Sequence, residues 1–207
     1  MKRKISFILA IIIALMPLNI VRVGLYRFLF NYNIESSKIG WLTILNINTL
    51  HMRSASIGSF NIFTGPMDVN MGLNSRIGLF NYFKCGAWAV QSEYSHALIL
   101  EHKAGISIQH YFDVAGRIYL GEKSIIAGVR SQFWTHGGTS KNVDIYIGNN
   151  CYIGSGTKFA PGTKISDDSL VAMGSVVTKE FEKRNVLIAG VPAKIIREEV
   201  NWKENWK

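Results

Sequence analysis

The residue best placed for acid–base chemistry is His136, which stands directly before the flexible, polar segment Gly137–Asn142. An imidazole titrates near neutral pH, so it can accept and release a proton under cellular conditions. His110 and Asp113 lie one to two turns of the repeat earlier, and we expect them either to orient His136 or to bind a hydroxyl group of a ligand. Local structural roles for His110 and Asp113 are the alternative, and His136 itself could be a turn residue.

The elements that must position these residues are indicated by a six-residue repeat over 147–178. Its first position is always apolar: Ile147, Ile153, Phe159, Ile165, Val171 and Val177. Its fifth position is always small: Cys151, Thr157, Thr163, Ser169 and Ser175. A period of six suits neither an α-helix nor an alternating strand, but it suits a solenoid in which three short strands and three turns close one triangular coil. We therefore predict an all-β solenoid domain over 39–180.

Six-residue spacing also appears earlier in the chain, and we predict degenerate coils over 40–100, where 79–100 is aromatic and irregular. The interval from Ile126 to Ile147 is longer than three hexads by half a hexad. The excess must bulge outward from the wall, and the Gly-rich segment Gly137–Asn142 is the predicted place.

The N-terminal segment, 1–38, is predicted to be a helical appendage. MKRK leads into an apolar run over 5–21, whose length is at the lower limit for crossing a bilayer. Positive charge on both sides of the run favours a helix that lies on a membrane surface over one that spans it. A spanning anchor, a cleaved signal and a buried core helix are the alternatives. Residues 22–32 are predicted to continue as an amphipathic helix with Arg22 and Arg27 on its polar side.

The C-terminal segment, 181–207, follows the last hexad and is predicted to cap the solenoid. Pro192 begins a new element there, and 193–206 is predicted to be a helix. A solenoid needs such a cap because its last coil presents an unpaired strand edge.

The composition points to anionic partners in a reducing compartment. The net charge is +9, and only two cysteines, Cys85 and Cys151, are present. This pattern favours nucleotide phosphates or acidic lipid as partners and gives no disulfide framework. Nucleic acid is not expected because no binding motif is present.

The segments TH, IYIGNNCYIGSGTKFAPGTKISDDSLVAMGSVVTK and NVLIAGVPAKIIR resemble the hexapeptide-repeat acyltransferases, which fold as a left-handed parallel β-helix. The chain is most similar to galactoside, maltose and serine O-acetyltransferases and to acetyltransferases of capsule and lipopolysaccharide synthesis. The resemblance covers 105–197 well and 40–104 loosely. MPLNIVRVGLYR, near the N-terminus, is reminiscent of the membrane-associated polysaccharide branch.

This resemblance implies a homotrimer with acetyl-CoA lying between adjacent prisms. The family's catalytic histidine falls on His136, which would act as general base on an acceptor hydroxyl during direct acyl transfer. A backbone N–H on the prism wall would stabilise the oxyanion. His110 and Asp113 would assist His136 or bind the acceptor.

Eight positions match the family's coenzyme-binding segments. The pantetheine arm is expected to meet backbone groups at Ser155, Ala172, Met173 and Gly174, with Thr178 and Lys179 further along the groove and Lys194 and Arg197 at the CoA phosphates. The alternative is that the three basic residues are simply solvated. The sequence departs from many relatives in having Tyr152 in place of Trp and Met173 in place of Ala.

The resulting hypothesis is an O-acetyltransferase that uses acetyl-CoA and modifies a sugar hydroxyl of a polysaccharide precursor, on a glycan or lipid-linked sugar, at the cytoplasmic face of the inner membrane. Acceptor contacts are expected from 79–113 and 137–142. An N-acyltransferase for an amino-sugar nucleotide and a non-catalytic β-helix scaffold are the alternatives. No metal is expected, because the spacing of His102, His110 and His136 does not match the zinc ligands of the γ-class carbonic anhydrases, which share this fold.

Overall fold

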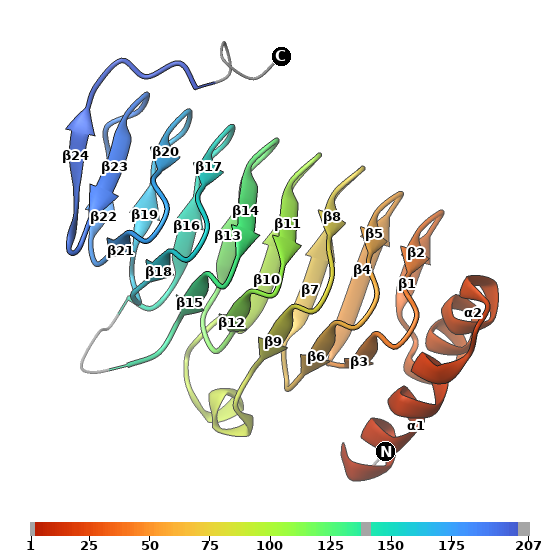
Figure 1. The fold of residues 1–207 in the computed structure, drawn as a ribbon. Coiled ribbons are helices and arrows are strands. Elements are labelled where there is room, and N and C mark those ends of the chain that lie inside the picture. The colour runs from red at the N-terminus through yellow and green to blue at the C-terminus, as the bar shows by residue number, and fades with distance from the viewer. Residues whose placement is uncertain (1–2, 138–141, 203–207) are drawn as a thin grey trace.

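The protein is a prism of stacked triangular coils with two helices at one end, as Figure 1 shows for the computed structural model. The structure describes residues 3–137 and 142–202. Three successive strands form one coil, and each strand pairs in parallel with the strand three places later in the chain. The exception among the described strands is the last pair, which is antiparallel.

The strands form three sheets, one for each face of the prism. Sheet A contains β1 (Asn33–Glu35), β4 (Thr49–Arg53), β7 (Asp68–Met71), β10 (Ala97–Leu100), β13 (Ile118–Leu120), β16 (Ile145–Ile147), β19 (Lys164–Ile165) and β22 (Glu180–Phe181). Sheet B contains β2 (Lys38–Ile39), β5 (Ser56–Ile57), β8 (Arg76–Ile77), β11 (Gly105–Ile108), β14 (Ile125–Val129), β17 (Tyr152–Ile153), β20 (Leu170–Val171), β23 (Leu187–Gly190) and β24 (Ala193–Arg197). Sheet C contains β3 (Ile44–Asn46), β6 (Ile62–Thr64), β9 (Tyr82–Lys84), β12 (Tyr111–Asp113), β15 (Gln132–Trp134), β18 (Lys158–Phe159) and β21 (Val176–Val177).

The register confirms three hexads per coil. Ile153 pairs with Val171, and Ile39 pairs with Ile57, so partners are three hexads apart at both ends of the chain. The predicted early coils over 40–100 are therefore present, and they stack in the same three sheets as the clean repeat.

The interior holds the first-position side chains in columns. The column behind sheet C consists of five stacked phenylalanine rings with centroids 4.2 to 4.8 Å apart: Phe63, Phe83, Phe112, Phe133 and Phe159. All five are essentially inaccessible to solvent. Each buried aromatic ring contributes about 3–5 kcal/mol relative to alanine, so this column is a main source of stability.

Coil corners use the left-handed backbone conformation. Asn150 and Asp168, with φ of 54° and 57°, are residue types that tolerate it. Phe60 and Phe80 adopt it too, with φ of 62° and 58°, although bulky side chains disfavour it. Their exposed rings stack 4.7 Å apart, which offsets part of that strain.

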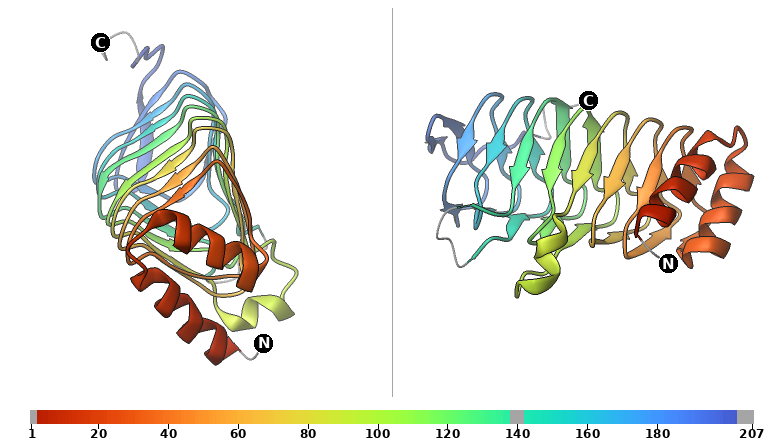
Figure 2. Two further views of the ribbon diagram at one scale, coloured as in Figure 1. Left: turned by 90° about the vertical axis from the view of Figure 1, so that its right-hand side faces the viewer. Right: turned by 90° about the horizontal axis from the view of Figure 1, so that it is seen from below.

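Two segments leave the prism wall, and both do so at the corner between sheet C and sheet A. The first excursion, 85–96, lies between β9 and β10 and contains the 3₁₀ helix η1 (Ala87–Gln91), which stands out from the prism in Figures 1 and 2. The second excursion, 135–144, lies between β15 and β16. The predicted bulge at Gly137–Asn142 falls between β15 and β16, and its residues 138–141 lie outside the described part of the chain.

The N-terminal segment forms two helices, α1 (Arg3–Leu15) and α2 (Asn19–Phe30), which lie across the end of the coil stack in Figure 2. The apolar run is thus divided at Pro17, whose ring and missing N–H interrupt a helix. Neither helix in the described residues is long and apolar enough to cross a bilayer.

The predicted exposure of Arg22 is wrong. Its side chain is 4% exposed, and its Nη2 and Nε donate to the Ile39 carbonyl at 2.8 and 3.2 Å. Its Nη1 donates to the Pro17 carbonyl at 2.9 Å. The guanidinium is buried because it satisfies carbonyls that the break between the helices leaves without backbone partners.

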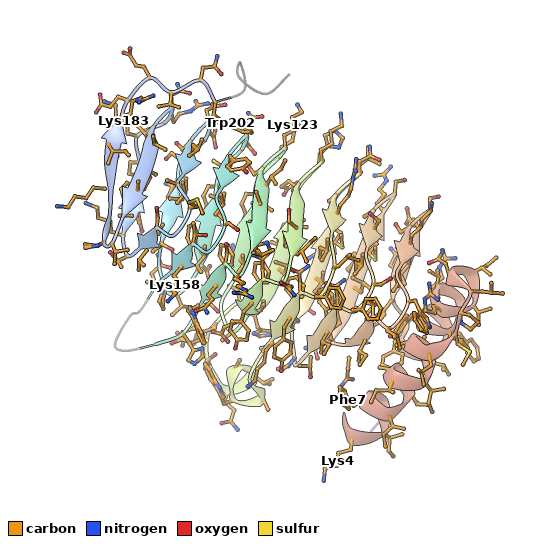
Figure 3. The ribbon with its side chains drawn as sticks, viewed as in Figure 1. Lys4, Phe7, Lys123, Lys158, Lys183 and Trp202 are labelled. Carbon is orange, nitrogen blue, oxygen red and sulfur yellow. The ribbon has the colours of Figure 1, made fainter. Side chains whose placement is uncertain are left out.

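The predicted C-terminal helix over 193–206 is also wrong, because β24 is a strand that pairs antiparallel with β23. A hairpin satisfies the open edge of sheet B directly, which a helix laid across the edge would not do. Residues 198–202 then turn back over the prism, where the Trp202 indole donates to the Asn150 carbonyl at 2.9 Å (Figure 3). Residues 203–206 lie outside the described part of the chain.

Candidate active site

The candidate site is built on a contact between His136 and Asp113 at the corner where both excursions leave the prism. Asp113 ends β12, and Trp134 of β15 is its partner in the next coil, so His136 begins its excursion beside Asp113. The His136 Nδ1 donates to Asp113 Oδ2. The His136 side chain is 42% exposed and that of Asp113 is 4% exposed. A buried carboxylate thus holds one ring nitrogen and leaves Nε2 as the nitrogen for chemistry.

Thr135 fixes the carboxylate in place. Its backbone N–H donates to Asp113 Oδ2 at 3.2 Å, and its hydroxyl donates to the Asp113 carbonyl at 2.6 Å. The same hydroxyl accepts the Gly116 N–H at 2.8 Å. These bonds join the base of the second excursion to the preceding coil, so the imidazole and its carboxylate partner keep a fixed geometry.

The prism corner between the two excursions, at Gly116 and Arg117, contacts both of them. A Cβ at Gly116 would lie 2.8 Å from the Val143 side chain and 3.1 Å from that of Thr135, so a larger residue would push the second excursion outward. Arg117 donates through Nη2 to the Ser95 hydroxyl at 3.2 Å and through its backbone N–H to the Asp144 carboxylate at 2.8 Å. Arg117 therefore joins the first excursion to the second.

Two tryptophans flank the imidazole. Trp88 of η1 meets His136 edge to face with ring centroids 5.1 Å apart, and Trp134 lies 6.5 Å away. Their side chains are 44% and 36% exposed, which is unusual for such large apolar rings. Sequence reasoning did not single out either tryptophan. For Trp88 the available signal was the aromatic richness of 79–100, where the hexad phase is lost.

His110 is not brought to His136. It belongs to the corner ladder, a column of buried polar residues that precede successive strands of sheet C: Thr43, Asn61, Asn81, His110, Ser131, Thr157 and Ser175. Each of the central members accepts an N–H from the next coil. Asn81 Oδ1 accepts the His110 N–H at 2.9 Å, and His110 Nδ1 accepts the Ser131 N–H at 3.0 Å.

This environment keeps His110 neutral. Burial lowers the pKa of His110 from 6.5 to about 4, although the nearby Gly128 carbonyl opposes the shift. Nδ1 accepts a hydrogen bond, so the proton sits on Nε2, which makes no hydrogen bond within the described residues. His110 therefore belongs to the corner ladder, beside Asn81 and Ser131. The residue that orients His136 is Asp113.

The positions predicted to bind the coenzyme fall at two places on the prism. Ser155, Ala172, Met173 and Gly174 lie at the corner between sheets B and C, where Met173 is 76% exposed. The N–H groups of Ala172 and Gly174 already donate to the carbonyls of Ile188 and Ser155, both at 2.8 to 2.9 Å. Met173 is therefore the residue of this turn whose N–H is not engaged by another described residue.

The remaining predicted positions are exposed near the C-terminal end of the prism. Thr178 and Lys179 follow β21, and the Lys179 ammonium lies 5.5 Å from the Phe181 ring centroid. Lys194 and Arg197 lie on β24. Lys194 and Arg197 thus lie about four coil spacings, or ~19 Å, beyond the level of His136, and Lys179 lies about two coil spacings, or ~10 Å, beyond it.

No group of three or more His, Cys, Asp or Glu side chains that could hold a metal ion occurs within 3–137 and 142–202.

Comparisons with known proteins agree with this architecture. Residues 144–179 match the family model described as bacterial transferase hexapeptide, six repeats. A hexapeptide-repeat-containing acetyltransferase from Vibrio cholerae has a similar structure, with a TM-score of 0.51 and 18% identity over 95% of this chain and 90% of that chain. The resemblance to hexapeptide-repeat acetyltransferases is therefore confirmed for the repeat and the fold, and the repeat is typical of a left-handed β-helix.

Two further solved structures are less similar. A maltose O-acetyltransferase from Clostridium difficile 630 has a TM-score of 0.49 and 20% identity over 61% of this chain and 67% of that chain. A polysialic acid O-acetyltransferase has a TM-score of 0.45 and 20% identity over 83% of this chain and 86% of that chain. No curated protein matches the sequence significantly.

The ladder position of His110 predicts a specific pH dependence, which His110→Asn should remove. Asparagine fits because Asn61 and Asn81 fill this position in the two preceding coils. Above pH 6.5 neither the folded nor the unfolded wild-type chain protonates His110. Between pH 6.5 and 4 only the unfolded chain takes up that proton, so wild type should lose on the order of 3 kcal/mol of unfolding free energy, with no further loss below pH 4.

Denaturant titrations of wild type and His110→Asn at pH 7, 6, 5 and 4.5 measure this difference, and carboxylates common to both proteins cancel. Parallel pH profiles would show that burial does not perturb this histidine.

Proposed function

We propose that the protein is an acetyl-CoA-dependent O-acetyltransferase that acts on a sugar hydroxyl of a polysaccharide precursor. The observation that carries the proposal is the His136–Asp113 pair, an exposed imidazole oriented by a buried carboxylate at the root of an excursion from a hexapeptide-repeat prism. This pairing is the arrangement a general base needs, because it fixes the tautomer and stabilises the imidazolium that forms.

In the proposed reaction, His136 Nε2 takes the proton of the acceptor hydroxyl as its oxygen attacks the thioester carbonyl of acetyl-CoA. The tetrahedral intermediate collapses by breaking the C–S bond, and the leaving thiolate takes the proton back from the imidazolium. Products are the acetyl ester and CoA, and no covalent enzyme intermediate is required. Asp113 accepts the Nδ1 hydrogen bond throughout and offsets the positive charge of the ring.

The donor would extend from His136 toward the C-terminal end of the prism. Met173 would bring its free N–H and exposed side chain to the pantetheine arm, beside Ser155. Lys194 and Arg197 would meet the phosphates, which require positive charge, and Lys179 would lie further along the groove. Ala172, Gly174 and Thr178 would form part of the groove wall. The N–H groups of Ala172 and Gly174 already donate to carbonyls of the prism, so they would not bind the donor.

We propose a homotrimer, because one chain places these groups on different corners. His136 lies between sheets C and A, and Met173 lies between sheets B and C. The two corners are separated by the width of sheet C, roughly 10 Å for a three-residue strand. A neighbouring chain that sets its Met173 corner against the His136 corner would complete the site.

We also propose that the N-terminal helices lie on the cytoplasmic face of the inner membrane. Their outer faces expose large apolar residues, including Ile8 at 57%, Ile20 at 78% and Phe28 at 85%. Besides the buried Arg22, residues 1–80 contain seven Lys or Arg and two Asp or Glu, so these seven and two residues give this part a net charge of +5. Apolar side chains beside positive charge suit an anionic lipid surface.

Replacing the proposed base should abolish transfer while leaving donor binding intact. For His136→Asn we expect acetyl transfer to fall by about 10²- to 10⁴-fold, the usual contribution of a general base. The assay uses labelled acetyl-CoA and envelope glycan from a strain that lacks this gene, and calorimetry measures CoA binding. His51→Asn, an exposed histidine on β4, is the control. Transfer by His136→Asn at the wild-type rate would refute the assigned base, and a wild type that does not bind CoA would favour the scaffold alternative.

Co-assembly tests whether the site lies between chains. His136→Asn and Met173→Arg should each be inactive alone, and Met173→Arg should fold because its side chain is exposed. In a trimer that contains both variants, one of the three interfaces joins an intact His136 to an intact Met173, so about a third of wild-type activity should return. Differently tagged chains, purified through both tags, are assayed as above. Inactive mixed trimers, or an active monomer, would contradict the shared site.

Membrane association is tested with vesicles of phosphatidylethanolamine and phosphatidylglycerol at 3:1. Wild type should sediment with them, and a variant with Ile8, Ile20 and Phe28 replaced by Gln should bind at least tenfold more weakly, because each apolar side chain contributes about 1.5–3 kcal/mol when buried. Val191→Gln with Ile196→Gln, also exposed but at the other end of the prism, is the matched control. Equal loss in both variants would argue against an N-terminal membrane surface.

A further inference from the structure

We propose that the outer face of β9, β12 and β15, beside His136, binds the acceptor and selects a sugar that carries a carboxylate. The aromatic platform consists of Tyr82, Tyr111 and Trp134 on this face and Trp88 of η1, and Lys84 supplies the positive charge. The inference rests on the proposed function and names the chemical class of its acceptor.

The register brings these residues together on one face. Tyr82 pairs with Tyr111, and Lys84 pairs with Asp113. Asp113 pairs in turn with Trp134. Neighbouring strands lie about 4.8 Å apart, so Lys84, Asp113 and Trp134 form a row of roughly 10 Å. That length is comparable to one or two sugar rings. Trp134, at the end of the row, directly precedes the excursion that carries His136.

The aromatic rings form a continuous surface. The Trp134 ring is tilted against Tyr111 with centroids 4.8 Å apart, and Tyr111 meets Tyr82 at 5.7 Å. Tyr82 is 37% exposed and Trp134 is 36% exposed. Half-exposed aromatic faces with a hydroxyl or N–H at the edge match a sugar ring, which offers an apolar C–H face and a polar rim.

Trp88 closes this surface on the side of the first excursion, and Gly86 provides the space for it. A Cβ at Gly86 would lie 2.3 Å from the Trp88 Nε1, so the indole rests directly on the backbone there. The same indole lies edge to face with His136 at 5.1 Å. Trp88 and Trp134 thus approach the imidazole from two excursion roots, which would direct the hydroxyl of a stacked ring toward Nε2.

Lys84 gives the face its charge selectivity. Its side chain is exposed, and none of the ion pairs among the described residues includes it. The neighbouring acid, Asp113, directs its Oδ2 to His136 and Thr135. The ammonium is therefore available to a carboxylate on the acceptor, and the overall charge of +9 would favour approach of an acidic glycan.

The test compares envelope glycan from the deletion strain with the same glycan after carbodiimide and borohydride treatment, which reduces its carboxylates to alcohols. For wild type we expect reduction to raise the acceptor KM about tenfold, as loss of a charge-assisted hydrogen bond does. Lys84→Gln should show the higher KM with untreated glycan and no further rise with reduced glycan. The KM for acetyl-CoA should not change in either case.

The platform is tested with Trp134→Ala, which should raise the acceptor KM about tenfold, and with Trp134→Phe, which should restore most of it. Gly86→Ala, which displaces Trp88 without removing it, should also raise the acceptor KM. Trp41→Ala is the control, because Trp41 is 46% exposed but lies at the helix-covered end. Binding of both glycans to His136→Asn, measured by calorimetry, reports acceptor affinity without turnover.

Equal KM values for the two glycans, or an unchanged acceptor KM in Lys84→Gln or Trp134→Ala, would overturn this inference and leave the proposed function standing. Failure of wild type to transfer acetyl groups to either glycan would overturn the proposed function itself. An equal rise of the KM for acetyl-CoA in Trp134→Ala would show that the platform supports the fold and does not bind the acceptor.

Discussion

Parallel hydrogen bonding between successive coils is the constraint on which the rest of this structure depends. Each strand must lie over the strand three places earlier, so equivalent positions in successive coils become neighbours. Like residues then stack on like residues, as in the phenylalanine column behind sheet C. The corner ladder follows from the same rule, because a side chain at a corner can reach the backbone N–H of the next coil.

This constraint also decides where extra chain can go. An insertion within a strand would break the register with two neighbours, whereas an insertion at a corner leaves all three sheets paired. Both long insertions, 85–96 and 135–144, leave at the corner between sheets C and A, two coils apart, with one corner without an insertion between them. Asp113 and the bridging Arg117 flank that intervening corner, so the site is a consequence of two insertions on the same edge of the prism.

The corner ladder shows how context decides the use of a reactive side chain. His110 directly precedes β12 and His136 follows β15, so these two histidines belong to consecutive coils. His110 is enclosed in the ladder, where burial lowers its pKa. It forms hydrogen bonds with both the coil before it and the coil after it. The other stands at the edge of an excursion with its Nδ1 on a carboxylate and its ring half exposed. Chemistry is available to the second because the register places a carboxylate beside it.

The sequence by itself determined the coil. An apolar first position, a small fifth position and turn residues at each corner permit only a three-strand coil, so the fold class, the coil length of the clean repeat and the position of the second bulge could all be derived from local pattern. His136 was singled out because it stands where the hexad phase breaks and because the catalytic histidine of the resembling family falls there. These features are local, so they can be recognised in the sequence without knowing which distant segments pack together.

Only the tertiary structure decided which residues surround that histidine. Trp88 is distant from His136 in the sequence and reaches it because two separate insertions leave the same corner, which no local pattern records. Arg22 reads as a surface residue on a helical wheel, yet the break at Pro17 creates carbonyls that draw it inside. The segment after Pro192 has a composition that allows a helix, yet the open edge of sheet B makes it a strand, because unpaired backbone groups there gain hydrogen bonds that a helix would leave unmade.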